Sequence, residues 1–246
     1  MRHFRPPSRI LDHVARCTHA LLAFAALSVC ATAHGSGAEA ADDPCAKVDA
    51  GYALDDSVRG AFGSPPSVNA CIDVLRAQHD GPRRLRIFVD GKRVVSNDAI
   101  AMGPDEGGAM GDPYQSLEVS RGSLVVGNAG GGGPMRWNET WHLTIRNGQW
   151  IIAGWDFDGW DWHRAADGGG EFHTSVNALT GDVTDSYASL VDDNNDNDDT
   201  PPKHTTHRAC KLPPGWRSPA IAQVAAIRDR SWRCDAKLAK PIRSGK

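Results

Sequence analysis

The dipeptide Asn147-Gly148 constrains this chain more than any other feature, because it lies between two segments of alternating apolar and polar residues. Both central positions of a type I′ turn need a positive φ, which Asn and Gly adopt readily, so the pair predicts a β-hairpin with a two-residue turn. The turn fixes which residues face each other across the strands. The predicted cross-strand pairs are Ile145 with Trp150, Leu143 with Ile152, and Trp141 with Gly154.

The two faces of this predicted hairpin differ in character. One face is a continuous wall of large apolar side chains and is predicted to be core. The opposite face is mixed, since it carries Trp155 together with polar residues. A shift of one residue would exchange the two faces, so the turn and the hydrophobic pattern support the same register.

Strand patterns punctuated by glycine dominate the rest of the middle of the chain, where helical periodicity is nearly absent. Asp90-Gly91, Arg121-Gly122 and Thr180-Gly181 predict further hairpin turns. Ser218 and Pro219 are suited to open a short helix over residues 218–229. The fold class is therefore mostly β: an antiparallel curled sheet, or a barrel or sandwich, with one short C-terminal helix. Besides the central hairpin, the predicted strands are residues 71–76, 84–89, 93–96, 117–120, 123–126, 173–179 and 182–188.

Residues 1–33 show the three zones of an export signal in order. Arginines precede the first acidic residue, an apolar run follows at residues 21–29, and small residues end it at Ala31-Thr32-Ala33. The apolar run is too short for a bilayer, which takes about 20 residues. We therefore predict a removable signal peptide at 1–33, a flexible tether at 34–44, and a periplasmic or secreted protein. Cys30 is a candidate for lipidation, which would attach the protein to a membrane.

Cysteine number and spacing favour disulfides. Of six cysteines, two fall within the signal, which leaves Cys45, Cys71, Cys210 and Cys234. An even number in an oxidising compartment implies two disulfides. Three connectivities exist, and we favour Cys45–Cys71 with Cys210–Cys234 because each closes a local loop. A zinc site is disfavoured, since no CxxC spacing occurs.

The net charge of −3 is near neutral for this length and gives no basic nucleic-acid-binding footprint. We expect residues 45–246 to form a single β-rich domain with an acidic loop at 192–200, whose Asp and Asn residues cannot bury apolar area. Calcium binding is a weak alternative for this loop. Counted from Asp192, positions six and twelve are Asn197 and Lys203, where an EF-hand needs Gly and Glu. We therefore predict no cofactor.

Motifs for catalysis are not recognisable in the sequence. The glycines at 130–133 lack the Lys-Ser/Thr pair and the helix of a phosphate loop, so they predict a turn or bulge between strands. A G-x-S-x-G nucleophile elbow does not occur. The four cysteines outside the signal are all expected in disulfides. We therefore predict that the protein is not an enzyme.

Residues 155–163 place aromatic side chains beside carboxylates and are the strongest candidate for a functional surface. Carboxylates with exposed aromatics suit a sugar-cleaving enzyme, in which a pair of acids acts on the glycosidic bond. Trp, Tyr and Arg among polar groups suit a protein-binding surface. A third interpretation is a strand end with half-buried tryptophans. The predicted partner-binding residues are Tyr114, Arg136, Trp155, Asp156, Asp158, Trp160, Asp161 and Trp162.

A set of short motifs occurs in a fixed order within residues 103–187. They are Gly111-Asp112-Pro113-Tyr114, Leu117-Glu118-Val119, Gly122-Ser123-Leu124-Val125-Val126, Arg136-Trp137, Gly148-Gln149-Trp150-Ile151-Ile152-Ala153-Gly154 and Asn177-Ala178-Leu179-Thr180-Gly181. This ordered set resembles a family of bacterial exported β-rich proteins. The family includes periplasmic immunity proteins, often lipoproteins, that inhibit peptidoglycan-hydrolase effectors of bacteria-killing type IV secretion systems.

The resemblance implies a periplasmic immunity protein that binds and occludes a cell-wall hydrolase in bacterial competition. The implied partner is a peptidoglycan-hydrolase effector, and no nucleic acid is expected. Residues 78–82 keep little of the Asp-rich repeat that is common in the family, so its metal binding is not carried over. The alternative function is a cell-wall glycan-binding protein or a glycosidase that uses residues 155–163.

Overall fold

The computed structural model describes Cys45 and residues 47–133, 135–161, 170–189, 204–230 and 232–234, all within the unit Ala41–Lys246. The predicted signal peptide, tether and acidic loop lie outside the described residues, as do Cys30 and Trp162. No helix among the described residues is long and apolar enough to cross a membrane.

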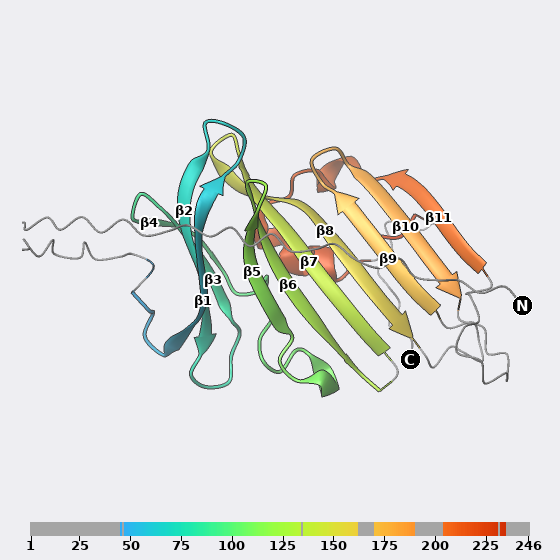
Figure 1. The fold of residues 1–246 in the computed structure, drawn as a ribbon, viewed down its shortest axis with the longest axis horizontal. Coiled ribbons are helices and arrows are strands. Elements are labelled where there is room, and N and C mark those ends of the chain that lie inside the picture. The colour runs from blue at the N-terminus through green and yellow to red at the C-terminus, as the bar shows by residue number, and fades with distance from the viewer. Residues whose placement is uncertain are drawn as a thin grey trace, which may run out of the picture. The chain divides into compact units, whose positions relative to one another are not determined.

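The described residues form eleven strands in two antiparallel sheets (Figure 1). One sheet has four strands in chain order: β1 (Tyr52–Phe62), β2 (Val68–Ala77), β3 (Arg84–Val89) and β4 (Lys92–Asn97). The other has seven strands, ordered from β11 to β5: β5 (Tyr114–Ser120), β6 (Ser123–Gly132), β7 (Met135–Arg146), β8 (Gln149–Asp161), β9 (Gly170–Asn177), β10 (Asp182–Ser189) and β11 (His204–Lys211). Among these strands β11 pairs with β10 alone, so the larger sheet is open rather than a closed barrel. The mostly β, antiparallel fold with one short C-terminal helix is confirmed.

Three two-residue turns carry the predicted backbone signature. Both central residues have positive φ at Asp90-Gly91 (48° and 73°), Arg121-Gly122 (50° and 76°) and Asn147-Gly148 (52° and 74°). The registers that follow from the last two turns are confirmed next to each turn. The observed pairs are Val119–Leu124, Leu117–Val126, Ile145–Trp150 and Leu143–Ile152.

The predicted register of the central hairpin is wrong beyond Leu143. A bulge between His142 and Leu143 inserts one residue of β8, so Trp141 faces Trp155 and His142 faces Gly154. A bulge of this kind moves the following side chains to the opposite face. Trp155 is therefore 3% exposed and packs in the core, where we predicted it on the mixed face.

The C-terminal helix begins later than predicted. Ser218 has a φ of 47°, and the Pro219 carbonyl accepts a hydrogen bond of 2.9 Å from the Ile152 amide. Ala220 forms an isolated β-bridge with Ile151. The expected cap at Ser218 is wrong, because this segment extends the sheet beside β8. The helical turns are a 3-10 turn at Ile221–Gln223 and α1 at Val224–Arg228.

The core joins both sheets to the C-terminal segment, with α1 against one face of the seven-stranded sheet (Figure 1). The Phe62 ring of β1 lies 5.1 Å from that of Trp150 in β8. The predicted disulfides are confirmed as Cys45–Cys71 and Cys210–Cys234. The second disulfide links β11 to the chain after α1.

Candidate functional site

The central strands β7, β8 and β9 present a row of polar side chains on the face opposite the core. Cross-strand pairing places Arg136 beside Trp160, and Asp158 beside His173. Side chains alternate between the faces of a strand, so residues paired in this way or two positions apart share one face. We call this set the outer row: Arg136, His142, Asp156, Asp158, Trp160 and His173.

Two aspartate–histidine pairs form the centre of the outer row. His142 Nε2 lies 2.9 Å from Asp156 Oδ2, and the two side chains are 37% and 29% exposed. His173 Nδ1 bonds the carboxylate of Asp158, and both side chains are about half exposed. Each carboxylate therefore has a histidine partner on a neighbouring strand while remaining open to solvent.

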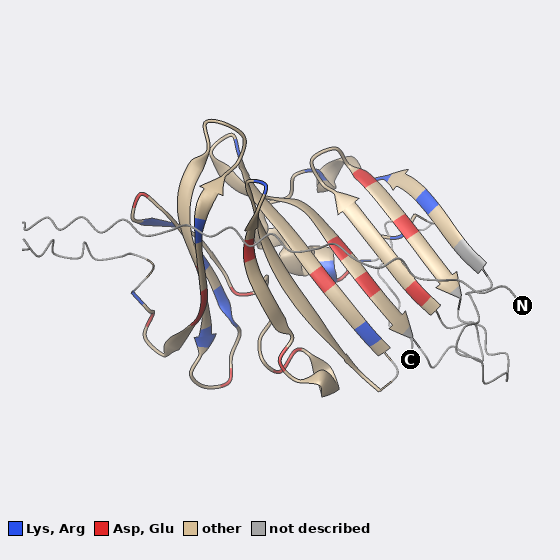
Figure 2. Ribbon diagram, viewed as in Figure 1, with Lys and Arg blue, Asp and Glu red and all other residues tan. Residues whose placement is uncertain are grey.

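The environment of Asp156 favours its ionised form. Burial raises the pKa of this carboxyl group, but hydrogen bonds from His142 and Ser175, with the charges of His142 and His173, lower the pKa by more. The net result is a pKa below its usual value, as expected when hydrogen bonds favour the charged form. Acidic residues recur along β7 to β10 (Figure 2).

The structure brings together four of the predicted partner-binding residues: Arg136, Asp156, Asp158 and Trp160. Tyr114 lies elsewhere, on β5, where its hydroxyl donates to Asp56 at 3.0 Å. Trp155 belongs to the core. The side chain of Asp161 and all of Trp162 lie outside the described part of the chain.

Sequence reasoning missed the two histidines of the outer row. His142 could have been found, because it alternates with Trp141 and Leu143 in the predicted hairpin and so falls on the mixed face. His173 could not, because its approach to Asp158 depends on the pairing of β8 with β9 across the intervening segment. Alternation within a single strand says nothing about which other strand lies beside it.

The buried ion pair of Glu139 and Arg228 was also missed. Glu139 is 5% exposed on the core face of β7, and its two oxygens lie 2.6 Å and 2.8 Å from Arg228 Nη2 and Nε. Asn128 and Trp141 donate further hydrogen bonds to this carboxylate. Burial lowers the pKa of the Arg228 guanidinium, but Glu139 raises it by more. This ion pair links α1, through Arg228, to β7 of the seven-stranded sheet, through Glu139.

A shallow hollow of about 300 Å³ adjoins the outer row and is lined by residues that include Asp158, Trp160, Glu171 and His173. Among the residues that the structure describes, no group of three or more His, Cys, Asp or Glu side chains is arranged to hold a metal ion. Comparisons with family models, curated proteins and solved structures found no match to this chain.

Proposed function

We propose that this protein is an exported inhibitor that docks its outer row on a peptidoglycan hydrolase and keeps substrate out of the hydrolase cleft. The observation that carries the proposal is the placement of Arg136, Trp160 and two paired aspartates on one face of a hydrogen-bonded sheet. Arginine and tryptophan anchors set among polar groups are typical of residues that dominate protein interfaces. The ordered motifs of the sequence favour the same class of partner.

The chemistry of a glycan-cleaving cleft indicates how the outer row would fit it. Such clefts contain a pair of catalytic carboxylates. Arg136 Nη1 donates to the carbonyls of Gly133 and Met135, which orients the guanidinium. Its Nη2 and Nε have no acceptor among the described residues and could pair with a carboxylate of the hydrolase. Trp160 offers an aromatic face of the kind that stacks on sugar rings, and would fill a subsite.

The glycosidase alternative is less well supported by the electrostatics. A general acid for glycoside cleavage needs a raised pKa so that it carries a proton at neutral pH. Asp156 has a lowered pKa instead. Asp158 is bonded to His173. Both carboxylates are therefore better placed to hold the row in one conformation than to donate a proton.

A turbidity assay on cell-wall suspensions tests the proposal, with this protein alone and with the exported hydrolase encoded nearest to it. We expect no clearing by the protein alone and inhibition of the hydrolase. Trp160→Ala should weaken inhibition at least about tenfold, the loss of one interface anchor. Val94→Ala is the matched control, because Val94 is exposed on β4 of the other sheet.

Two results would contradict the proposal. Clearing by this protein alone that disappears in Asp158→Asn would establish the glycosidase. Absence of inhibition, or equal inhibition by wild type and Trp160→Ala, would show that the outer row does not contact the hydrolase.

A further inference from the structure

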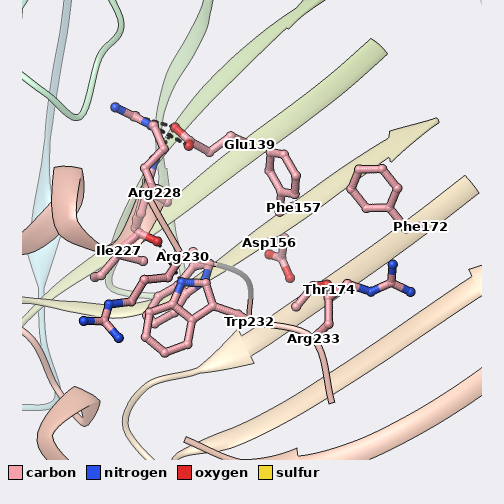
Figure 3. Close-up of a pocket in the computed structure, with 12 residues that line it drawn as sticks. Glu139, Asp156, Phe157, Phe172, Thr174, Ile227, Arg228, Arg230, Trp232 and Arg233 are labelled. Carbon is pink, nitrogen blue, oxygen red and sulfur yellow. Dashed lines mark hydrogen bonds and ion pairs between the residues drawn. The ribbon is translucent and has the colours of Figure 1, made fainter. Parts of the chain in front are cut away.

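The core face of the same strands contains a partly enclosed pocket of about 100 Å³, whose lining includes Asp156 of the outer row. Figure 3 shows it between residues of β7 to β9 and residues of the C-terminal segment 227–233. We call it the inner pocket. Its walls come from parts of the chain that are far apart in sequence, so the pocket exists only when the C-terminal segment is docked.

Aromatic rings make most of the wall of the inner pocket. The Trp155 ring lies 5.9 Å from that of Trp141 and 5.2 Å from that of Trp232. Phe157 and Phe172, whose rings are 5.6 Å apart, are only half-buried and lie toward solvent. Such a wall favours an apolar body with a flat or branched shape.

One hydrogen-bond donor in this wall is unused. Trp141 Nε1 donates to Glu139, and Trp232 Nε1 donates to the Ile227 carbonyl at 2.8 Å. Trp155 Nε1 is buried and has no acceptor among the described residues. A buried donor without a partner is destabilising, so an acceptor on a ligand would relieve this cost.

The charges around the inner pocket favour an anionic acceptor. Three arginines, Arg228, Arg230 and Arg233, contribute to its lining. Glu139 takes hydrogen bonds from Asn128, Trp141 and Arg228. Two of the arginines are themselves paired, Arg228 with Glu139 at 2.6 Å and Arg233 with Asp185 at 3.2 Å. The charged residues of the lining are three arginines and two carboxylates, Glu139 and Asp156, so positive charge is in excess by one.

We propose that the inner pocket binds a small organic carboxylate with about four carbon atoms in all, the carboxyl carbon included. A cavity of about 150 Å³ lined by apolar side chains holds benzene, so one of about 100 Å³ holds a smaller body. The body packs among the rings of Trp155, Phe157 and Trp232. The carboxylate accepts the Trp155 N–H, and the arginines stabilise its charge.

Titration of the full-length mature protein with isobutyrate tests this proposal by saturation-transfer NMR and tryptophan fluorescence. We expect saturable binding that weakens as salt is added. The neutral isostere isobutyramide should bind about tenfold more weakly, because hydrogen bonds to charged groups are the stronger ones. 1-Naphthoate, which is too large for the pocket, should not compete.

Two variants locate the binding site. Trp155→Phe keeps a ring and removes the N–H donor, so isobutyrate should bind about tenfold more weakly. Trp150→Phe is the matched control, because Trp150 Nε1 is also buried without an acceptor among the described residues but Trp150 does not line the pocket. Its affinity should equal that of wild type.

Three results would overturn the proposal: no saturable binding of isobutyrate to wild type, equal affinity for isobutyrate and isobutyramide, or equal affinity in wild type and a folded Trp155→Phe variant. The first two need no variant, so the proposal stays testable even where a substitution unfolds the protein. None of these results depends on inhibition of a hydrolase.

Discussion

The outer row and the inner pocket share strands β7 to β9 and one residue, Asp156, yet they are assembled in different ways. Asp156 of the outer row pairs with His142, 14 residues away across one hairpin. Glu139 on the core face pairs with Arg228, 89 residues away. The comparison shows that the β7–β8 hairpin alone brings five of the six residues of the outer row together on its solvent side, and only His173 comes from another strand. The pocket on the other side of the hairpin needs a distant segment to be brought over it.

Breaking the buried ion pair should have the largest effect. Arg228→Met leaves Glu139 without a cation, and we expect a loss of about 3–5 kcal/mol in the free energy of unfolding. Urea denaturation measures it. The double variant Glu139→Gln with Arg228→Met should recover part of the loss, because no uncompensated charge remains. A loss under about 1 kcal/mol for Arg228→Met would show that the helix is held by apolar packing alone.

Removing the two disulfides one at a time tests whether the outer row and the inner pocket depend on different parts of the chain. Cys45–Cys71 and Cys210–Cys234 close loops of similar length, with sequence separations of 26 and 24. Replacing either pair by alanine should therefore cost about 2–4 kcal/mol on the chain-entropy model. Both costs can be compared by thermal unfolding.

Only the second disulfide lies next to the segment that lines the inner pocket. Its removal should weaken isobutyrate binding, whereas removal of Cys45–Cys71 should leave that affinity unchanged. Both variants should still inhibit the hydrolase while folded. Equal binding by the two variants would break the link between the C-terminal segment and the pocket.

Gly148→Val should destabilise the hairpin that carries both sites. Gly148 has a φ of 74°, and a Cβ atom there would meet nothing within 4 Å, so the cost is one of backbone conformation rather than of contact. We expect a loss of about 1–2 kcal/mol in urea denaturation. Gly148→Asn is the control, because Asn tolerates this conformation. Equal losses for Val and Asn would argue against a strained backbone.

The smallest expected effect is the pH dependence contributed by Asp156. Its pKa is lower in the folded protein than the ordinary value of 3.8, so ionised Asp156 stabilises the fold above that pH. The contribution is lost as the pH falls through the lower, folded-state pKa. The stability difference between wild type and Asp156→Asn should therefore be largest near neutral pH and shrink below about pH 4.

Urea midpoints between pH 2 and pH 7 would check this behaviour of Asp156. We expect the pH-dependent contribution of Asp156 to the free energy of unfolding to be less than about 1 kcal/mol, because its pair with His142 is partly exposed. His142→Gln should reduce the same pH dependence. If the stability difference between wild type and Asp156→Asn grew at acid pH, the pKa of Asp156 would be raised in the folded protein. That result would favour the glycosidase alternative.

Much of the fold could be predicted from local chemistry. Turn pairs such as Asp90-Gly91 and Asn147-Gly148 need positive φ, which few residues adopt readily, so they mark hairpins and set the register beside each turn. The long strands β1 and β11 were missed. Neither is attached to a hairpin turn predicted from the sequence, and tertiary pairing decides whether such a segment becomes a strand.

The sequence by itself determined three of the hairpin turns, the mostly β class and the favoured disulfide pairing, because each depends on residues close together in the chain. Two features depend on the tertiary structure alone. They are the bulge that places the Trp155 side chain in the core and the position of His173 beside Asp158. The tertiary structure also decided the ion pair of Glu139 with Arg228. The physical reason is that strand order and burial depend on the energy of the whole packed core, which no single segment contains.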